Sequence, residues 1–121
     1  MKPRFGEHFL CKEFACPCCG MALMDRDFMI ALNHLRALAD RPIKINSGFR
    51  CKSHNYAVGG ALGSFHTMGK AADIVIAGLT LGEMFEIAEQ VEAFRDGGIG
   101  IYPRKGFIHL DSRGYPARWK K

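Results

Sequence analysis

Hydrophobic residues recur at helical spacing in two stretches of the chain. In the first, Asp25 is a candidate N-cap and apolar residues follow at intervals of three and four, which predicts an amphipathic helix over about 25–39. In the second, Thr80 and Glu83 form a capping-box pattern ahead of an apolar stripe that continues to Val91. The sequence therefore predicts two main helices.

Short runs with the apolar pattern of β-strands lie between and after these helices. They cover residues 43–45, 72–76, 99–102 and 107–111. The last two are joined by a hairpin-type connection over 103–106, so we expect them to pair. Alternation along the final strand places Phe107, His109 and Asp111 on one face. The length of 121 residues predicts a single domain over residues 1–121.

Other segments have weaker patterns. Phe9–Phe14 predicts a short strand or coil, and Ser53 is a candidate cap for a short helix that runs through Ala57. Residues 58–63 contain three glycines and predict a flexible loop, while the aromatic and basic tail over 115–119 is expected to pack over an edge.

Composition and charge limit the possible partners. No segment approaches the ~20 uninterrupted apolar residues of a membrane span. The N-terminus lacks the apolar core and cleavage site of a signal peptide, so we expect cytosolic synthesis. The net charge of +5 favours anionic partners, among them nucleic acid and bacterial cell wall. Because no basic helix is interleaved with aromatic residues, nucleic acid is not the expected partner. We expect a monomer.

Four of the five cysteines lie within residues 11–19, and Cys51 stands alone. An odd count without a leader argues against a secreted disulfide framework. Cys16 and Cys19 form a C-x2-C pair, and Cys51 and His54 supply a second pair at similar spacing. Three thiolates and an imidazole could form a closed structural zinc site. Buried free thiols, or a single disulfide to Cys51, are the alternatives.

A different candidate metal site joins His66, Asp73 and His109. His66 and Asp73 lie seven positions apart, with a glycine and small residues between them. Imidazole nitrogen and carboxylate oxygen both bind zinc, which in catalytic sites usually has three protein ligands and one open position. The spacing alone equally fits a helix-cap histidine and a solvated aspartate, so the neighbouring motifs must decide.

Ordered blocks of residues around these positions occur at separations that fit one protein family. The blocks are Ser47-Gly48-Phe49-Arg50, Asn55, Val58-Gly59-Gly60, Ser64-x-His66-x2-Gly69-x-Ala71-x-Asp73-Ile74, Gly98-x-Gly100-x-Tyr102-Pro103 and Phe107-Ile108-His109-x-Asp111. Over about residues 9–119 the chain resembles the zinc D-Ala-D-Ala carboxypeptidase family. Its short bacterial and phage-borne branch of peptidoglycan peptidases is the most similar.

The resemblance implies an α+β fold, with a small antiparallel sheet and the two main helices. It also implies a zinc peptidase activity on D-alanine bonds of peptidoglycan, by carboxypeptidase or endopeptidase cleavage. It implies one catalytic Zn2+ bound by His66, Asp73 and His109. It also implies that Arg50 stabilises the substrate carbonyl as it becomes an oxyanion, and that Ser64 and Tyr102 lie at the substrate. The expected partner is a peptidoglycan stem peptide. The chain would act on the cell wall in phage lysis, as part of a virion, or after export by another route.

One departure from the family concerns the general base. Many members place an acidic residue or a histidine two or three residues before the last zinc histidine, where this chain has Phe107 and Gly106. Asp111 is the first candidate for the base, or else a partner that orients the imidazole of His109. His54 is a more distant candidate for the base. The alternative function is a non-catalytic, zinc-stabilised structural or cell-wall-binding module, for instance of a phage particle.

Overall fold

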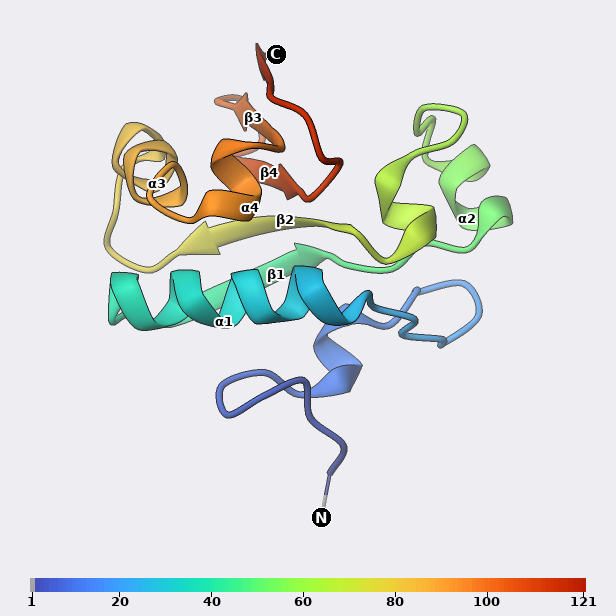
Figure 1. Cartoon of the computed structure of the whole chain (residues 1–121). Helices are drawn as coiled ribbons and strands as arrows, with labels where there is room; N and C mark the ends of the chain where they lie inside the picture. The colour runs from blue at the N-terminus through green and yellow to red at the C-terminus, as the bar shows by residue number, and fades with distance from the viewer. Residues whose placement is uncertain (1) are drawn as a thin grey trace.

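The computed structural model describes residues 2–121, in which helices pack against one five-stranded sheet (Figure 1). The strands are β1 (Ile43–Ser47), β2 (Ala71–Ile76), β3 (Gly98–Tyr102), β4 (Phe107–Asp111) and β5 (Ala117–Lys120). The α-helices are α1 (Arg26–Ala39), α2 (Lys52–Ala57), α3 (Leu81–Ala88) and α4 (Glu92–Arg95), and the 3-10 helices are η1 (Cys11–Phe14) and η2 (Phe65–Met68). This content confirms the predicted α+β class.

The sheet has the strand order β1-β2-β4-β3-β5. Its pairings are antiparallel, except that β5 pairs parallel to β3 at the edge. The tail that was expected to pack over an edge is therefore a strand of the sheet itself. Within the described residues, none of the helices is both long and apolar enough to cross a membrane.

One face of the sheet forms the hydrophobic core beneath α1, α3 and α4. Helix α1 contacts α3 and α4, and these two helices contact β3 and β4. Because side chains alternate between the two faces of a strand, every second residue of the central strands is apolar and points into this core. These residues include Ala72, Ile74, Ile76, Ile99, Ile108 and Leu110, which pack with Phe28, Leu32 and Phe94 of the helices. Phe28 and Phe94 meet edge to face at 5.7 Å.

The opposite face carries a row of residues in register across all five strands, three of which are polar. Ser47 pairs with Asp73, Asp73 with His109, His109 with Gly100, and Gly100 with Trp119. We call these five residues the cross-strand row. It forms because a register shift in β1 skips Asn46, so that Ser47 lies directly opposite Asp73.

Two local predictions about the first half of the chain are corrected. Residues of the predicted strand or coil over Phe9–Phe14 instead form η1, in which the backbone N–H of Leu10 donates to the carboxylate of Glu13 at 2.7 Å. This turn lets Phe9 and Phe14 both enter the core, with their rings 5.6 Å apart. The cap of α2 is Cys51 rather than Ser53.

The predicted caps of the two main helices are confirmed. Asp25 accepts from the N–H of Phe28 at 2.9 Å, and Thr80 and Glu83 form the capping box of α3. The second helix is shorter than predicted, since it ends at Ala88 instead of continuing to Val91. Val91 then adopts an extended conformation, is buried, and caps α4.

Candidate functional site

Three side chains from separate elements meet above the cross-strand row. Asp73 and His109 are direct partners on β2 and β4, and His66 lies on η2. Ser64 caps η2, and Gly69 ends it with a left-handed φ of 71°, which turns the chain back into β2. The structure thus brings together the three residues predicted to bind the catalytic metal, and all three are buried.

The distances between the ligand atoms suit a tetrahedral zinc ion. The Oδ1 atom of Asp73 lies 3.3 Å from His66 Nε2 and 3.0 Å from His109 Nδ1. Two ligands at 2.0–2.2 Å from a tetrahedral metal are separated by about 3.3–3.6 Å. The distance to His66 lies at the edge of this range and the distance to His109 is slightly shorter, while all three atoms lie within 4.8 Å of one another, so they are close enough to share a cation.

The hydrogen bonds on the far side of each ring select the tautomer. His66 Nδ1 lies 2.8 Å from the carbonyl oxygen of Gly48, which can only accept, so Nδ1 carries the hydrogen. His109 Nε2 likewise donates to Asp111 Oδ2 at 2.7 Å. In the neutral rings, the remaining nitrogens direct their lone pairs at Asp73.

Two lone pairs and a carboxylate in one buried place require a positive charge between them, either protons or a metal cation. Burial would raise the pKa of Asp73, but hydrogen bonding to His109 and His66 lowers it well below its usual range. Burial alone would lower the pKa of His109, yet Asp111 and Asp73 raise it. Imidazole and carboxylate ligands are a set that zinc accepts, so these residues fit that ion.

Asp111 lies behind His109 and is fully buried. Arg113 donates to both of its oxygens, at 2.9 and 2.8 Å, and the backbone N–H of Gly98 donates at 2.9 Å. Burial would raise the pKa of Asp111, but Arg113 and His109 lower it well below its usual range. A side chain at Gly98 would collide with this carboxylate. Asp111 is therefore an ionised group held in place to accept from His109.

Arg50 is oriented by three polar groups at the edge of the same site. Its guanidinium donates to Ser47 Oγ at 3.1 Å, to Asn55 Oδ1 at 3.4 Å and to Asp73 Oδ2 at 3.3 Å. Asn55 is buried and donates to the carbonyl of Ala61, so it is itself fixed. The guanidinium is thus held beside the carboxylate of Asp73.

A cleft of about 720 Å³ opens onto these residues. Its walls include both predicted substrate residues, Ser64 and Tyr102, together with Phe107 and Trp119. Tyr102 stacks on Phe107 at 4.7 Å, and its hydroxyl accepts from the indole N–H of Trp119 at 2.9 Å. The cleft therefore has an aromatic wall of fixed geometry beside the metal-binding residues.

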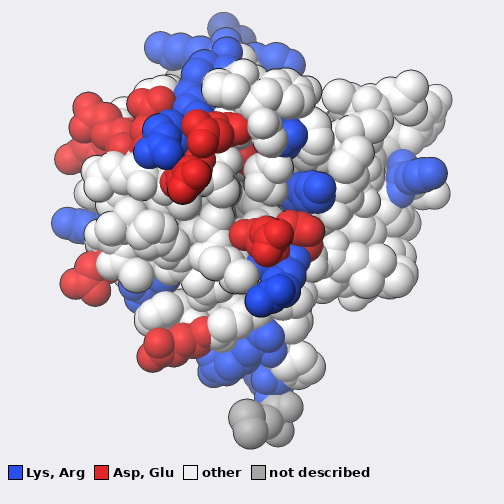
Figure 2. Space-filling model, in the orientation of Figure 1, with Lys and Arg blue, Asp and Glu red and all other residues white. Residues whose placement is uncertain are grey.

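The charged side chains that line the cleft are mostly cationic. They are Arg50, Lys105, Arg113 and Lys121. Within residues 2–121, the lining includes no carboxylate or imidazole other than His66, Asp73 and His109. Over the outer surface, acidic side chains gather on the α3 side, whereas the region of α2 and the loop that follows carries few charges (Figure 2). The cleft is therefore suited to an anionic ligand.

Sequence reasoning missed Arg113, Trp119 and the carbonyl of Gly48. Arg113 lies two residues after Asp111, and its guanidinium is within 5.1 Å of the ring centre of Trp119. The strand alternation that placed His109 beside Asp111 could have found Arg113. Trp119 depends on a parallel pairing that no local pattern reveals.

The predicted cysteine site is only partly assembled. The thiols of Cys16, Cys19 and Cys51 lie within 4.8 Å of one another. The imidazole of His54 is not part of this group, because His54 lies inside α2 and contacts Cys51 through its backbone N–H instead.

Comparison with known proteins places the site in a family context. The family model described as Peptidase M15 matches residues 7–111. The chain is 36% identical over 88 residues to a probable peptidoglycan L,D-endopeptidase MepK of Haemophilus influenzae, covering 69% of this chain and 45% of that protein. It is 36% identical over 83 residues to the peptidoglycan L,D-endopeptidase MepK of Escherichia coli K12, covering 64% and 43%. The chain thus spans less than half the length of these relatives.

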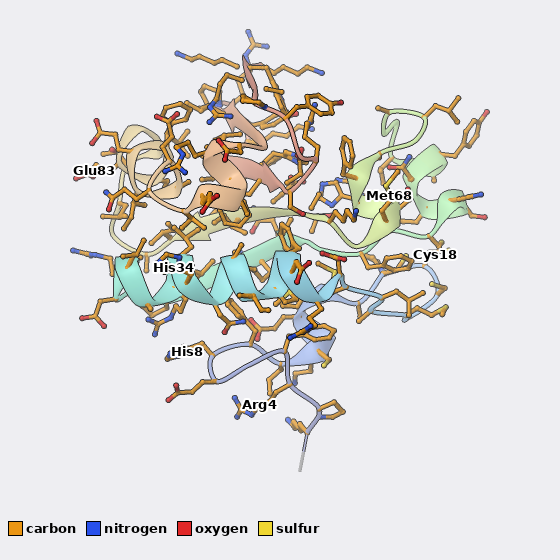
Figure 3. All side chains as sticks on the ribbon, viewed as in Figure 1. Arg4, His8, Cys18, His34, Met68 and Glu83 are labelled. Carbon is orange, nitrogen blue, oxygen red and sulfur yellow. The ribbon has the colours of Figure 1, made fainter. Side chains whose placement is uncertain are left out.

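The metal-binding role of the buried trio predicts that His66→Ala lowers zinc binding at this site by at least about 100-fold, because one of three ligands is lost. Isothermal titration with zinc, after chelator treatment, measures the change. His34→Ala is the matched control, since His34 is exposed on α1, well away from Met68 at the end of η2 (Figure 3). Equal zinc affinity in the two variants would contradict the assignment.

Proposed function

Because the chain belongs to the peptidase M15 family, we propose that it is a zinc-dependent peptidase that hydrolyses peptide bonds of bacterial peptidoglycan. The observation that carries the proposal is the convergence of His66, Asp73 and His109 at the floor of a cleft. Zinc would supply Lewis acidity there, and would make hydroxide available near neutral pH.

The other roles in the proposed reaction, which are metal binding, stabilisation of negative charge and substrate contact, fall to side chains of the cleft. His66, Asp73 and His109 would hold the metal, and Arg50 would donate to the carbonyl oxygen of the substrate as negative charge develops on it. The bonds from Arg50 to Ser47 and Asn55 support this role, because they fix the donor before substrate arrives. Ser64 and Tyr102 would contact the peptide from the two sides of the cleft.

The proposed substrate is a peptidoglycan stem peptide, and the proposed place of action is the cell wall. Both MepK relatives are named as peptidoglycan L,D-endopeptidases, which favours cleavage between an L- and a D-residue. The cationic lining of the cleft also supports a stem peptide as the substrate, because it attracts peptides that carry free carboxylates.

We propose that Asp111 orients His109 rather than acting as the general base. Its oxygens are engaged by His109, Arg113 and the N–H of Gly98, and it does not line the cleft. A base must reach the proton that it abstracts, directly or through one water. His54 does not line the cleft either.

A second candidate function is a non-catalytic module that binds the cell wall or contributes to a larger particle. The observation that favours it is the composition of the cleft, which within residues 2–121 has no carboxylate or imidazole besides the metal-binding trio. Such a module would keep the metal site and the cationic cleft for binding.

Digestion of purified peptidoglycan separates the two functions. With zinc present, we expect the chain to release new muropeptide fragments cut between an L- and a D-residue, as identified by mass spectrometry. His66→Ala should release none. Loss of only a terminal D-alanine would indicate a carboxypeptidase. Sedimentation with insoluble peptidoglycan and no new fragments would favour the non-catalytic module.

The proposed role of Arg50 predicts that Arg50→Ala lowers kcat by about 10²–10³-fold, the usual cost of removing one oxyanion donor. Zinc content should stay the same, because Arg50 is not a metal ligand. The matched control is Arg104→Ala, an exposed arginine outside the cleft lining, which should keep the wild-type kcat. Equal rates for the two variants would remove Arg50 from the mechanism.

The orienting role of Asp111 predicts that Asp111→Asn weakens zinc binding by roughly 10- to 100-fold, the usual effect of losing the partner of a ligand histidine. Zinc titration of the variant, followed by rate measurement at saturating zinc, tests this. A general base would show the opposite pattern, with zinc affinity retained and kcat lost. Asp96→Asn, at an exposed position, is the control.

A further inference from the structure

A cluster of thiols joins the N-terminal segment to the start of α2, apart from the residues of the proposed active site. Cys16 and Cys19 lie in the loop after η1, and Cys51 is the cap of α2. Their sulfur atoms lie within 4.8 Å of one another. Cys18, in the same loop, lies beneath α2 (Figure 3).

The loop over residues 16–20 is a tight turn that directs its thiols to one side. The N–H of Gly20 donates to the carbonyl of Cys16 at 2.8 Å, and the N–H of Cys16 donates to the carbonyl of Met21 at 2.7 Å. Gly20 has a left-handed φ of 75°, which a residue with a side chain would adopt only at a cost. The C-x2-C spacing of this turn is the spacing of structural zinc sites.

The distance between sulfur atoms distinguishes a shared metal from a disulfide. Cys16 Sγ and Cys51 Sγ are 3.7 Å apart. Two thiolates bound at about 2.3 Å to a tetrahedral zinc ion are separated by about 3.8 Å, whereas a disulfide needs about 2.05 Å. The observed spacing matches the metal.

Backbone N–H groups point at the sulfur atoms and would stabilise them as thiolates. The N–H of Cys51 donates to Cys16 Sγ at 3.5 Å, and the N–H of His54 donates to Cys51 Sγ at 3.4 Å. Thiolate is the form that binds zinc, so this arrangement favours metal binding.

We propose that Cys16, Cys19 and Cys51 bind a second, structural zinc ion, and that Cys18, an exposed thiol in the same loop that lies outside the 4.8 Å group, moves in as the fourth ligand when the ion binds. Four thiolates form a closed site with no position for a substrate. The ion would link the N-terminal loop to the segment that carries Gly48 and the proposed catalytic arginine. That segment already contacts η1, because the N–H of Phe49 donates to the carbonyl of Phe14 at 2.9 Å.

Metal counting in the full-length chain tests this proposal without any assay of peptidase activity. In a His66→Ala background, which removes the other site, elemental analysis should find about one zinc per chain. Adding Cys51→Ser should remove it. Adding Cys11→Ser instead should leave it, since Cys11 lies in η1 outside the cluster. Equal zinc in the two double variants would overturn the proposal.

Two measurements keep the test decisive if a variant fails to fold. Cobalt loaded into the His66→Ala chain should give the near-ultraviolet absorption of a thiolate-bound ion, and Cys18→Ser should weaken that absorption. In the wild-type chain, titration with a mercurial reagent should release about one zinc as the cluster thiols react. A wild-type mass lower by two hydrogens, with no zinc released by the reagent, would show a disulfide and overturn the proposal. Cobalt absorption unaffected by Cys18→Ser would overturn the assignment of Cys18.

Discussion

Two buried carboxylates on one face of the sheet constrain much of this structure. An ionised carboxylate that leaves water without compensation costs several kcal/mol, so Asp73 and Asp111 must each be surrounded by donors or cations. The compensating groups come from different parts of the chain, namely Arg50 after β1, His66 on η2 and Arg113 after β4. Across residues 2–121, no buried side-chain nitrogen or oxygen lacks a hydrogen-bond partner. The same contacts that satisfy these charges therefore hold the loops around the cleft.

The cross-strand row explains how a small sheet positions so many polar groups. Strand register fixes the separation of Asp73 and His109 more tightly than a loop could, because paired residues in a ladder have little freedom. Gly100 continues the row without a side chain, which leaves space for the indole of Trp119 beside the imidazole of His109, at 5.2 Å between ring centres. The helices on the other face contribute the apolar core that keeps the register.

The sequence predicted the elements better than their ends, and it predicted that His66, Asp73 and His109 lie together better than it predicted their surroundings. Alternation along β4 was enough to put His109 and Asp111 on one face, and the family match confirms the resemblance drawn from the ordered blocks. The predicted cap of α2, Ser53, lies two residues beyond the actual cap, Cys51, and the predicted second helix divides into α3 and α4 at Val91. Contacts between distant segments, such as that of Trp119 with β3, leave no periodic signal in the chain.

The two imidazoles of the site are oriented by different kinds of hydrogen-bond acceptor, so they differ in how easily a substitution can disturb them. His66 is oriented by the main-chain carbonyl of Gly48, so no particular side chain is needed as the acceptor. A side chain at Gly48 would, however, collide with the backbone of Phe14 and shift that carbonyl. His109 is oriented by the carboxylate of Asp111, which in turn relies on Arg113, and each of these can be lost by a single codon change. A side-chain substitution can therefore remove the acceptor of His109 outright, whereas the acceptor of His66 can only be displaced by a change in the backbone.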